Sequence, residues 1–324
     1  MSRETRVVFI GTPDFAVPTL EALIRHYAVV GVVTQPDRPA GRGRSERPSP
    51  VKQCALAHGL PVFQPVSLRK PDAVLHLSEW APDLFVTVAT GYILTAAVLA
   101  LPAQGTLNVH ASLLPRWRGA APIQAAVLAG DTQTGVTILC TDEGLDTGPI
   151  LRQRTVPIGI RDTALALHDK LAKVGADLLL DTLPSWLSGE LLPRPQPGEG
   201  VTYAPQIRKE DGLISWDATA VEIDRQVRAF APWPAAFTFW RHQRLKVVAA
   251  QPSPSAPFPL IASQEPSGAR EPGTVVLHGM LPAVITGHGI LQLDQLQLEG
   301  KRVLSGEAFV RGRPDFIGAR LGKN

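Results

Sequence analysis

The pattern of hydrophobic and polar positions changes character along the chain. In the first half, short runs that are apolar almost throughout alternate with segments whose apolar residues recur at helical spacing. Such runs are typical of strands that are buried on both faces of a parallel sheet. The predicted strands are Val7–Ile10, Ala28–Val33, Leu84–Ala89 and Thr106–Val109. The alternation therefore predicts an α/β domain with a doubly wound, mostly parallel sheet.

Helix signals and a change of strand direction complete this first domain. Val17–His26 carries apolar residues at helical spacing, and Ser49-Pro50 is typical of an N-cap followed by proline in the first turn. The apolar runs Gly135–Cys140 and Ile150–Pro157 are too close in sequence for a crossover helix, so we expect them to pair antiparallel. A long helix is predicted to follow over Asp162–Leu187.

The composition changes after this helix. Residues 189–205 are rich in glycine and proline, which predicts a linker between a first domain over residues 1–188 and a second over 206–324. The second domain has a predicted helix over Ala220–Phe230 and then short strands separated by turn residues, which favours a small β-barrel. Residues 251–272 lack periodicity and are predicted to form a surface loop. The predicted strands are Phe237–Trp240, Arg244–Ala249, Gly273–Leu277, Ala283–Thr286 and Ile290–Leu298.

Composition excludes several classes of protein. An apolar fraction of 44 % suffices for a core, and the 28 glycines and 30 prolines follow no period, which excludes disorder and collagen. No stretch of about 18 apolar residues could span a membrane, and Val7–Ile10 is too short for the core of a signal peptide. Cys54 and Cys140 cannot form a disulfide framework and have no metal-ligand partners nearby in sequence. We therefore expect a cytoplasmic protein without a metal site.

The net charge of +3 is unevenly distributed. Residues 1–203 carry 18 basic and 18 acidic side chains, whereas residues 204–324 carry 14 and 11. An excess confined to the second part suits an anionic partner such as nucleic acid, and it suits an ordinary solvated surface equally well. The basic residues near its end are Lys301, Arg302, Arg311, Arg313, Arg320 and Lys323.

The turn after the first predicted strand lacks the signature of a dinucleotide site. Residues 11–15 read GTPDF, and the proline and the bulky phenylalanine leave no small residue for the approach of a pyrophosphate. We therefore predict an ordinary strand-to-helix turn there.

Two polar residues stand at the end of the fourth predicted strand. Asn108 and His110 are two positions apart, so their side chains point to one face at the carboxyl end of the sheet, where open α/β proteins keep their sites. Burying an unpaired amide or imidazole costs roughly 1–3 kcal/mol, so these side chains either face a cleft or are satisfied by neighbouring backbone. Both interpretations stay open at this point.

An acidic turn lies between the two antiparallel strands. Residues 142–148 read DEGLDTG and supply Asp142, Glu143 and Asp146. An aspartate that reaches an imidazole sets its tautomer, although a purely turn-forming role for Asp146 is an equal alternative. Asparagine, histidine and aspartate together suit acyl transfer without a covalent intermediate, because the amide stabilises an oxyanion and the imidazole moves a proton. Ser112 lacks the G-x-S-x-G elbow that a nucleophile would need.

Longer motifs carry a resemblance to a known family. Residues 108–115 read NVHASLLP and continue as RWRG, and GVT at 135–137 precedes the acidic turn. In these motifs the chain resembles the folate-dependent formyltransferases. The motifs FIGTPDFAVPTLEAL at 9–23, VVTQPDRPAGRGR at 32–44 and RAFAPWPAAF at 228–237 are similar to the branch of that family that formylates the methionine carried by initiator tRNA.

The resemblance implies a fold, a reaction and residue roles. It implies a Rossmann-like formyltransferase domain and an OB-like β-barrel that contacts tRNA, in a chain that we expect to be monomeric. The formyl group of the co-substrate 10-formyltetrahydrofolate would pass to the α-amine of initiator methionyl-tRNA. By motif, Asn108 would bind the formyl oxygen, His110 would transfer the proton and Asp146 would orient His110. The residues that would bind folate are Ser112, Leu113, Leu114 and Pro115.

The same resemblance assigns the basic stretch at residues 38–52 to tRNA. Its tRNA-binding residues would be Arg38, Arg42 and Arg44, although a solvated basic loop is the alternative without the resemblance. One rival function is a formyltransferase that acts on a sugar nucleotide or another small amine, against which the basic stretch and the charge of the second domain argue. The other is an RNA-binding relative without catalysis, against which the presence of the candidate catalytic residues argues.

The chain departs from the family near the expected folate pocket. Where the family commonly has an aromatic residue before glycine, residues 88–92 read VATGY. Residues 139–141 read LCT in place of a segment that often holds methionine. The packing of folate around Thr90 is therefore left open.

Overall fold

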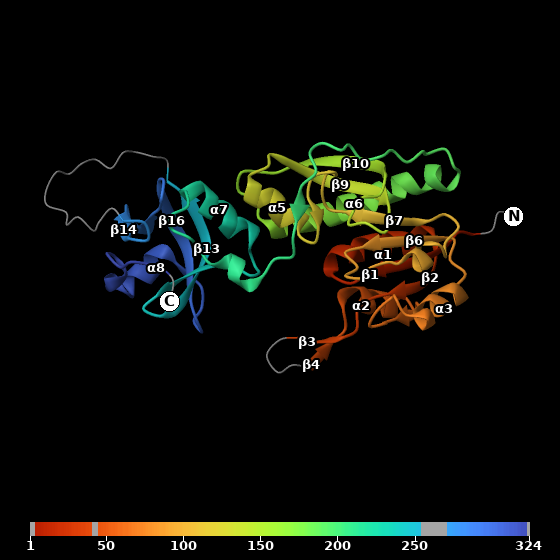
Figure 1. Cartoon of the computed structure of the whole chain (residues 1–324). Coiled ribbons are helices and arrows are strands. Elements are labelled where there is room, and N and C mark those ends of the chain that lie inside the picture. Colours follow the sequence, from red (N-terminus) through yellow and green to blue (C-terminus); the bar gives the residue numbers. More distant parts are fainter. Residues whose placement is uncertain (1–3, 41–44, 254–270, 323–324) are drawn as a thin grey trace. The chain divides into compact units, whose positions relative to one another are not determined.

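The computed structural model describes residues 4–40, 45–253 and 271–322, and the chain divides into two compact units (Figure 1). For residues 38–40 and 45–46 the description covers the backbone. Unit 1 comprises Met1–Ile123, Thr132–Ile158 and Ala166–Gln206. Unit 2 comprises Gln124–Asp131, Gly159–Leu165 and Ile207–Asn324.

Unit 1 is built around a seven-stranded sheet with the order β10-β9-β7-β6-β1-β2-β5. The five strands from β7 to β5 in this order are parallel, whereas β9 and β10 each run antiparallel to their neighbours. This confirms the predicted α/β class and the antiparallel pair. The strands are β1 (Arg6–Gly11), β2 (Ala28–Val33), β5 (Val62–Phe63), β6 (Leu84–Val88), β7 (Thr106–His110), β9 (Gln133–Cys140) and β10 (Ile150–Pro157).

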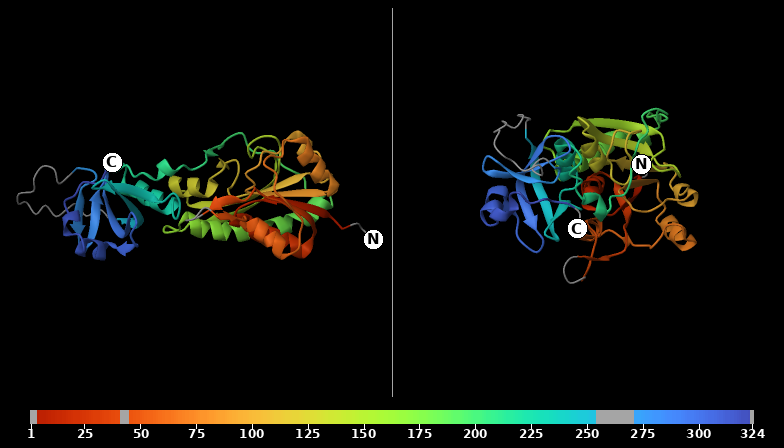
Figure 2. Two further views of the ribbon diagram at one scale, coloured as in Figure 1. Left: turned by 90° about the horizontal axis from the view of Figure 1, so that it is seen from below. Right: turned by 60° about the vertical axis from the view of Figure 1, so that its left-hand side comes forward.

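Helices cover both faces of this sheet (Figure 2). On one face, residues of α3 and α4 pack with strand residues such as Ile10 and Phe85 in a buried core. On the other, Gly175 lets α6 approach Val109 of β7, because a Cβ at this position would lie only 2.8 Å from the valine side chain. The helices are α1 (Val17–His26), α2 (Pro50–Ala57), α3 (Pro71–Glu79), α4 (Ala96–Leu99), α5 (Pro122–Ala129) and α6 (Ala164–Leu187).

The predicted helix starts agree with the structure where the sequence has a capping signal. The Ser49 hydroxyl accepts a hydrogen bond from the backbone N–H of Lys52 at 3.1 Å, and Pro50 is the first residue of α2. The helix predicted over Val17–His26 from the spacing of its apolar residues is likewise confirmed as α1. Helices α3, α4 and α5 were not among the predicted elements.

Unit 2 is an antiparallel sheet whose strand order is β12-β13-β16-β15-β14, with β17 beside β16. Residues 318–322 bond to both edges of this sheet. The Phe239 and Gly322 backbones exchange two hydrogen bonds at one edge, and Val275 N–H donates to Ala319 O at the other. The chain end therefore closes the sheet, as the predicted β-barrel requires. The strands are β12 (Ala236–Trp240), β13 (Gln243–Pro252), β14 (Val275–His278), β15 (Leu281–Ile285), β16 (Ile290–Leu298) and β17 (Leu304–Ser305).

Helix α7 (Ala220–Ala229) and helix α8 (Gly306–Arg311) pack against this sheet. Thr219 and Glu222 form a capping box at the start of α7, and the backbone N–H of Thr219 lowers the pKa of the Glu222 carboxyl. Of the predicted loop over residues 251–272, the first two residues belong to β13, and residues 254–270 lie outside the described residues.

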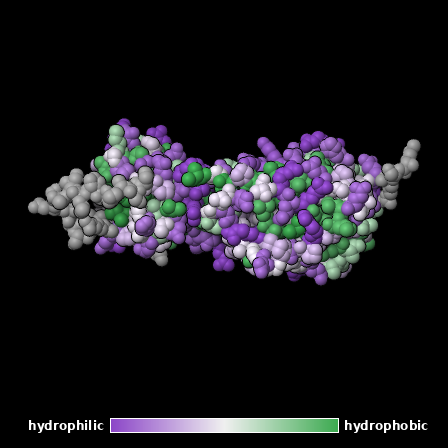
Figure 3. All heavy atoms as spheres, turned by 90° about the horizontal axis from the view of Figure 1, so that it is seen from above, coloured by the Kyte–Doolittle hydropathy of each residue, from purple (hydrophilic) through white to green (hydrophobic). Residues whose placement is uncertain are grey.

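The surface carries hydrophobic side chains in small groups among hydrophilic ones on the face shown in Figure 3. Among the described residues, no helix is both long enough and apolar enough to cross a membrane.

Candidate functional site

The two polar residues of β7 lie where strand alternation predicts them. Asn108 pairs in register with Leu139 of β9 and His110 with Thr137, so both side chains emerge on one face of the sheet. The Thr87 hydroxyl of the neighbouring strand donates to Oδ1 of Asn108 at 3.1 Å. This contact turns the Nδ2 group of Asn108 away from Thr87 and toward the loop that follows β9.

Asp146 reaches both residues from that loop. Its Oδ1 accepts a hydrogen bond from Asn108 Nδ2 at 3.2 Å, and its Oδ2 accepts one from the Gly119 backbone N–H at 2.8 Å. The same Oδ2 lies 3.5 Å from His110 Nδ1. The side chains of His110 and Asp146 are only 6 % and 14 % exposed, so solvent does little to screen the attraction between the carboxylate and an imidazole that has taken up a proton. The three residues predicted to act together therefore meet in one cluster, in which His110 is buried and Asn108 and Asp146 are half-buried.

The backbone of the Asp146 loop is tightly folded. Asp146 has φ of 53°, in the left-handed region that few residues other than glycine occupy. A Cβ at Gly148 would lie 1.8 Å from the Cys140 carbonyl oxygen, so this position requires glycine. The conformation holds the Asp146 carboxylate against β7.

The imidazole of His110 has a polar neighbour at each ring nitrogen. Nε2 lies 2.9 Å from the backbone carbonyl oxygen of Trp117. Because a carbonyl oxygen only accepts, Nε2 carries the hydrogen of this bond. Nδ1 faces the Asp146 carboxylate on the opposite side of the ring. The contact with Trp117 thus places the ring with Nδ1 toward the Asp146 carboxylate.

The other two carboxylates of the acidic turn fold the loop and do not contact His110. Asp142 accepts from the Gly144 N–H at 3.1 Å and from the Thr147 hydroxyl at 2.7 Å. Glu143 accepts from the backbone N–H of Ala96 at 3.2 Å, which ties this loop to the start of α4. The contacts of Asp146 with Asn108 and Gly119 distinguish it from these two neighbours and agree with the family motif, which singles out Asp146.

The segment predicted to bind folate, residues 112–115, is partly internal. Ser112 is buried and its hydroxyl donates to the Arg116 carbonyl oxygen at 2.6 Å, so it supports the loop and is not poised as a nucleophile. Leu114 is buried with Leu139 and Ile150. Leu113 and Pro115 are half-buried and remain the candidates of this segment for a direct contact.

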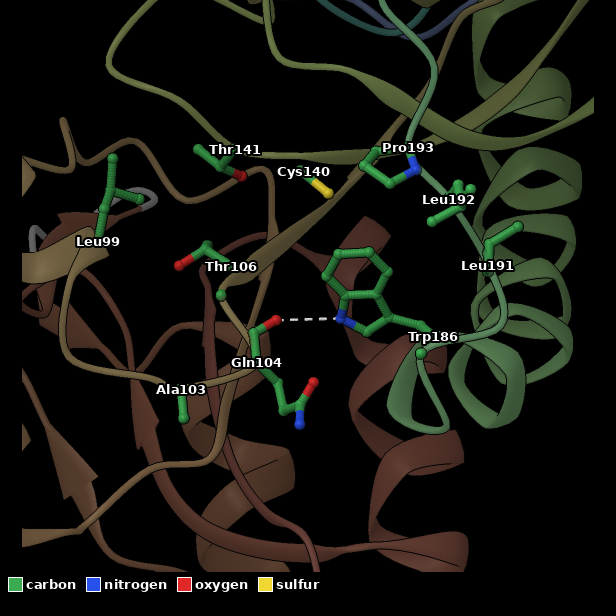
Figure 4. A pocket seen from close by; sticks show the side chains of 12 residues that line it. Leu99, Ala103, Gln104, Thr106, Cys140, Thr141, Trp186, Leu191, Leu192 and Pro193 are labelled. Carbon is green, nitrogen blue, oxygen red and sulfur yellow. Dashed lines mark hydrogen bonds between the residues drawn. The ribbon is translucent and has the colours of Figure 1, made fainter.

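A cavity of about 510 Å³ lies at the amino end of β7 (Figure 4), and neither Asn108 nor His110 is among the residues that line it. Thr106, Cys140 and Trp186 are among its lining residues, and the Trp186 indole donates to the Gln104 carbonyl oxygen at 3.0 Å. Burial raises the pKa of the Cys140 thiol to about 11, so this cysteine is a neutral thiol near pH 7 and a weak nucleophile.

We expect Cys140 to react slowly with iodoacetamide in the native protein. Its raised pKa leaves about 100-fold less thiolate near pH 7 than the ordinary value of 9.0 allows. Mass spectrometry of native and urea-unfolded protein measures the rates, with Cys54 as internal comparison. Equal rates for Cys140 in the two states would contradict the expectation.

The residues predicted to bind tRNA are only partly within the described chain. Arg42, Arg44 and the side chain of Arg38 lie outside the described residues. The flanking backbone forms an antiparallel pair between β3 (Arg38–Ala40) and β4 (Ser45–Arg47). Beside this pair, Lys52 Nζ donates to Asp37 at 2.5 Å, and Lys52 holds the pKa of the Asp37 carboxyl below its ordinary value.

The basic side chains near the end of unit 2 differ in how they are paired. Arg311 forms an ion pair with Glu307, and Arg320 forms one with Glu271. Lys301 and Arg302 are exposed and form no ion pair with the described residues. Lys323 lies outside the described residues.

Several residues of the cluster carry no signal in the sequence. The Trp117 carbonyl and the Gly119 N–H act through the backbone, so their residue types give no indication. Gln196 and Thr202 lie in the glycine- and proline-rich segment that predicts a linker, yet both donate or accept hydrogen bonds next to the cluster. No local periodicity could have found them.

Comparison with known proteins covers both units. Residues 5–183 match the family described as formyl transferase, and residues 206–314 match the formyl transferase C-terminal domain. A methionyl-tRNA formyltransferase of Symbiobacterium thermophilum is 48 % identical over 98 % of this chain and 95 % of its own length. One of Aromatoleum aromaticum is 49 % identical over 98 % of this chain and 96 % of its own length.

Solved structures share the fold at low identity. WlaRD, a sugar 3N-formyl transferase solved with dTDP and 5-N-formyl-THF, has a TM-score of 0.65 at 18 % identity, covering 93 % of this chain and 100 % of its own. HypX from Aquifex aeolicus in complex with tetrahydrofolic acid has a TM-score of 0.59 at 18 % identity, covering 97 % of this chain and 48 % of its own. At this identity the likeness concerns the fold alone.

Proposed function

Since the chain belongs to the formyl transferase family and matches methionyl-tRNA formyltransferases over nearly its whole length, we propose that it transfers the formyl group of 10-formyltetrahydrofolate to the α-amine of initiator methionyl-tRNA. The observation that carries the chemistry is the single cluster of Asn108, His110 and Asp146 at the carboxyl end of β7. It supplies an oxyanion donor, a proton carrier and a carboxylate within hydrogen-bond or ion-pair distance of one another.

Asn108 binds the formyl oxygen in this mechanism. Its Nδ2 has two hydrogens, of which one is donated to Asp146 and the other is available to a substrate oxygen. When the α-amine attacks the formyl carbon, the C=O π electrons move to this oxygen, and the Asn108 amide stabilises the resulting negative charge. Thr87 fixes the amide in the required orientation before substrate arrives.

His110 moves the proton. With its hydrogen on Nε2, the ring presents a lone pair at Nδ1, where it can accept the proton that the attacking amine loses. The positive charge so formed lies beside the Asp146 carboxylate, which stabilises it. His110 then returns the proton to the nitrogen of the leaving tetrahydrofolate as the old C–N bond breaks. An attacking α-amine must be neutral, which its ordinary pKa of about 8 allows near neutral pH.

The residues around the cluster suit a flat, partly apolar co-substrate. Ile93 and Leu145 are 62 % and 60 % exposed, and the loops that carry them are joined by the contact between Glu143 and Ala96. Exposed apolar side chains on adjoining loops fit a heteroaromatic ring. When bound there, 10-formyltetrahydrofolate supplies the formyl carbon. The Thr90 hydroxyl accepts a hydrogen bond from the Tyr92 N–H at 3.0 Å, so Thr90 stabilises the turn at residues 90–92, next to Ile93.

Basic residues of both units support tRNA as the carrier of the amine. In the first, the sequence of residues 38–52 contains the basic residues Arg38, Arg42 and Arg44. In the second, Lys301 and Arg302 are exposed without an ion pair among the described residues and can contact phosphate.

We expect Arg42→Ala to weaken tRNA binding and to leave kcat unchanged at saturating tRNA. Loss of one phosphate contact should reduce the slope of log Kd against log salt concentration by about one. Arg25→Ala is the charge-matched control, because Arg25 is an exposed arginine of α1 outside the basic stretch. Identical salt slopes for the two variants would remove Arg42 from the tRNA site.

A comparison of formyl acceptors tests the proposed function. The purified protein with 10-formyltetrahydrofolate should formylate methionyl-initiator-tRNA with a kcat/KM far above that for free methionine or for a nucleotide-linked amino sugar. Preference for the amino sugar would overturn the proposal in favour of the sugar formyltransferase alternative, for which the present support is likeness of fold.

A further inference from the structure

The glycine- and proline-rich segment after α6 is fastened to unit 1 at two places. Arg194 and Ile150 exchange backbone hydrogen bonds of 2.7 and 2.8 Å. Farther along, β11 (Tyr203–Ala204) pairs in parallel with β8 (Arg118–Gly119). The segment between these points therefore crosses next to the loop that carries Asp146.

Gln196 lies in this crossing and uses both ends of its side-chain amide. Nε2 donates to the backbone carbonyl oxygens of Asp146 at 2.7 Å and of Gly148 at 2.8 Å. Oε1 accepts from Arg118 Nε at 3.2 Å and from Arg118 Nη2 at 2.7 Å. Arg118 is 9 % exposed, so Gln196 supplies polar contacts to a guanidinium that is mostly removed from water.

The hydrogen bonds of Gln196 support the Asp146 carboxylate in two ways. The first is through the Asp146 backbone, whose left-handed conformation must be held by its surroundings. The second is through Arg118, because the next residue, Gly119, donates its backbone N–H to Asp146 Oδ2. Gln196 thus links the loop that carries the carboxylate to the strand that binds it.

A second residue of the segment supports the opposite side of His110. The Thr202 hydroxyl accepts a hydrogen bond from the Trp117 backbone N–H at 2.9 Å. The carbonyl oxygen of the same Trp117 accepts from His110 Nε2. The two groups that flank the imidazole, the Trp117 carbonyl and the Asp146 carboxylate, therefore both belong to residues that this segment binds.

We propose that Gln196 is a positioning residue for formyl transfer, which acts by holding Asp146 against His110 and Asn108. The proposal rests on the proposed function of the cluster. It assigns a mechanistic role to a segment whose composition alone predicts a linker. Gln196 itself touches neither substrate nor the reacting atoms.

Steady-state kinetics of Gln196→Ala test this role. A displaced Asp146 carboxylate should lower kcat by about 10- to 100-fold and leave KM for methionyl-tRNA nearly unchanged, because a misplacement of about 1 Å can cost this much. In an Asp146→Asn background the same change should have little further effect, since the group that Gln196 positions is already lost. Full kcat in Gln196→Ala, or a loss that multiplies with that of Asp146→Asn, overturns the proposal.

Gln196→Glu separates the two ends of the side chain. A carboxylate still accepts from Arg118 but cannot donate to the carbonyl oxygens of Asp146 and Gly148. We expect it to lose activity as Gln196→Ala does, and wild-type activity would overturn the proposal. Because Arg118 stays paired, this variant also serves if Gln196→Ala fails to fold.

Two controls isolate the effect. Arg194→Gln changes an exposed side chain of the same segment whose described contacts are made by its backbone, so kcat should stay at the wild-type value. Gln226→Ala removes an amide that likewise donates to two backbone carbonyl oxygens, of Asp211 and Leu213, in unit 2. It should lower the thermal stability of the protein without the loss in kcat. An equal loss of kcat in Gln226→Ala would mean that the effect is general destabilisation.

The ring nitrogens of His110 give a readout that does not depend on which amine receives the formyl group. In ¹⁵N NMR, Gln196→Ala should shift the His110 Nδ1 resonance toward its position in Asp146→Asn. An unchanged resonance overturns the positioning role. If the wild-type protein fails to formylate methionyl-tRNA but the shift occurs, the proposed function fails and the role of Gln196 stands.

Discussion

Replacement of Asp146 by asparagine should lower kcat by about 10³-fold while the affinity for tRNA stays near that of the wild type. The carboxylate accepts from Asn108 at one oxygen and from Gly119 at the other. An amide has one acceptor oxygen, so one of these donors loses its partner. The amide also lacks the negative charge that stabilises a protonated His110 ring.

Single-turnover formylation with enzyme in excess separates the chemical step from tRNA binding, which a filter or titration assay measures independently. Asp142→Asn is the matched control, because Asp142 lies in the same turn and bonds to Gly144 and Thr147 without contacting His110. Near-normal single-turnover rates in Asp146→Asn would remove the carboxylate from the mechanism.

Asn108→Ala should produce the second large loss, about 10²- to 10³-fold in kcat. Removal of one preorganised oxyanion donor costs roughly 3–4 kcal/mol of transition-state stabilisation in other acyl-transfer sites. The truncation also leaves Asp146 Oδ1 without the hydrogen bond that Asn108 Nδ2 donates. We expect KM for methionyl-tRNA to change little, because the donor acts on charge that develops during the reaction.

Thr87→Val should give a smaller loss of kcat than Asn108→Ala and so serves as a comparison for it. It removes the hydroxyl that donates to Asn108 Oδ1 but keeps the amide in place, so the fall in kcat should be smaller than in Asn108→Ala. Steady-state kinetics of both variants under saturating folate measure the difference. A larger loss in Thr87→Val than in Asn108→Ala would contradict the role given to the amide.

Local patterns of sequence predicted much of unit 1 because their physical causes are local. Strand alternation has a period of two, so Asn108 and His110 had to share a face once β7 was recognised. The short connection between β9 and β10 likewise required antiparallel pairing. Ser49 and Pro50 fixed the start of α2 through a hydrogen bond that spans three residues.

Contacts between distant segments could not be predicted in this way. Asp142, Glu143 and Asp146 are chemically equivalent in a turn, and only the loop conformation brings Asp146 to β7. Gln196 contacts a loop about fifty positions earlier, and glycine- and proline-rich sequence carries no periodicity that reveals where it is held. The backbone groups of Trp117 and Gly119 act without regard to side-chain type.

Transfer of a ¹³C-labelled formyl group is the most direct test of the central claim. The wild-type protein, given ¹³C-formyl-labelled 10-formyltetrahydrofolate and methionyl-initiator-tRNA, should place the label on the methionine α-nitrogen, and Asp146→Asn should bind the same tRNA but transfer almost none. Absence of label on methionyl-tRNA with the wild-type protein, or equal labelling by Asp146→Asn, would contradict the account.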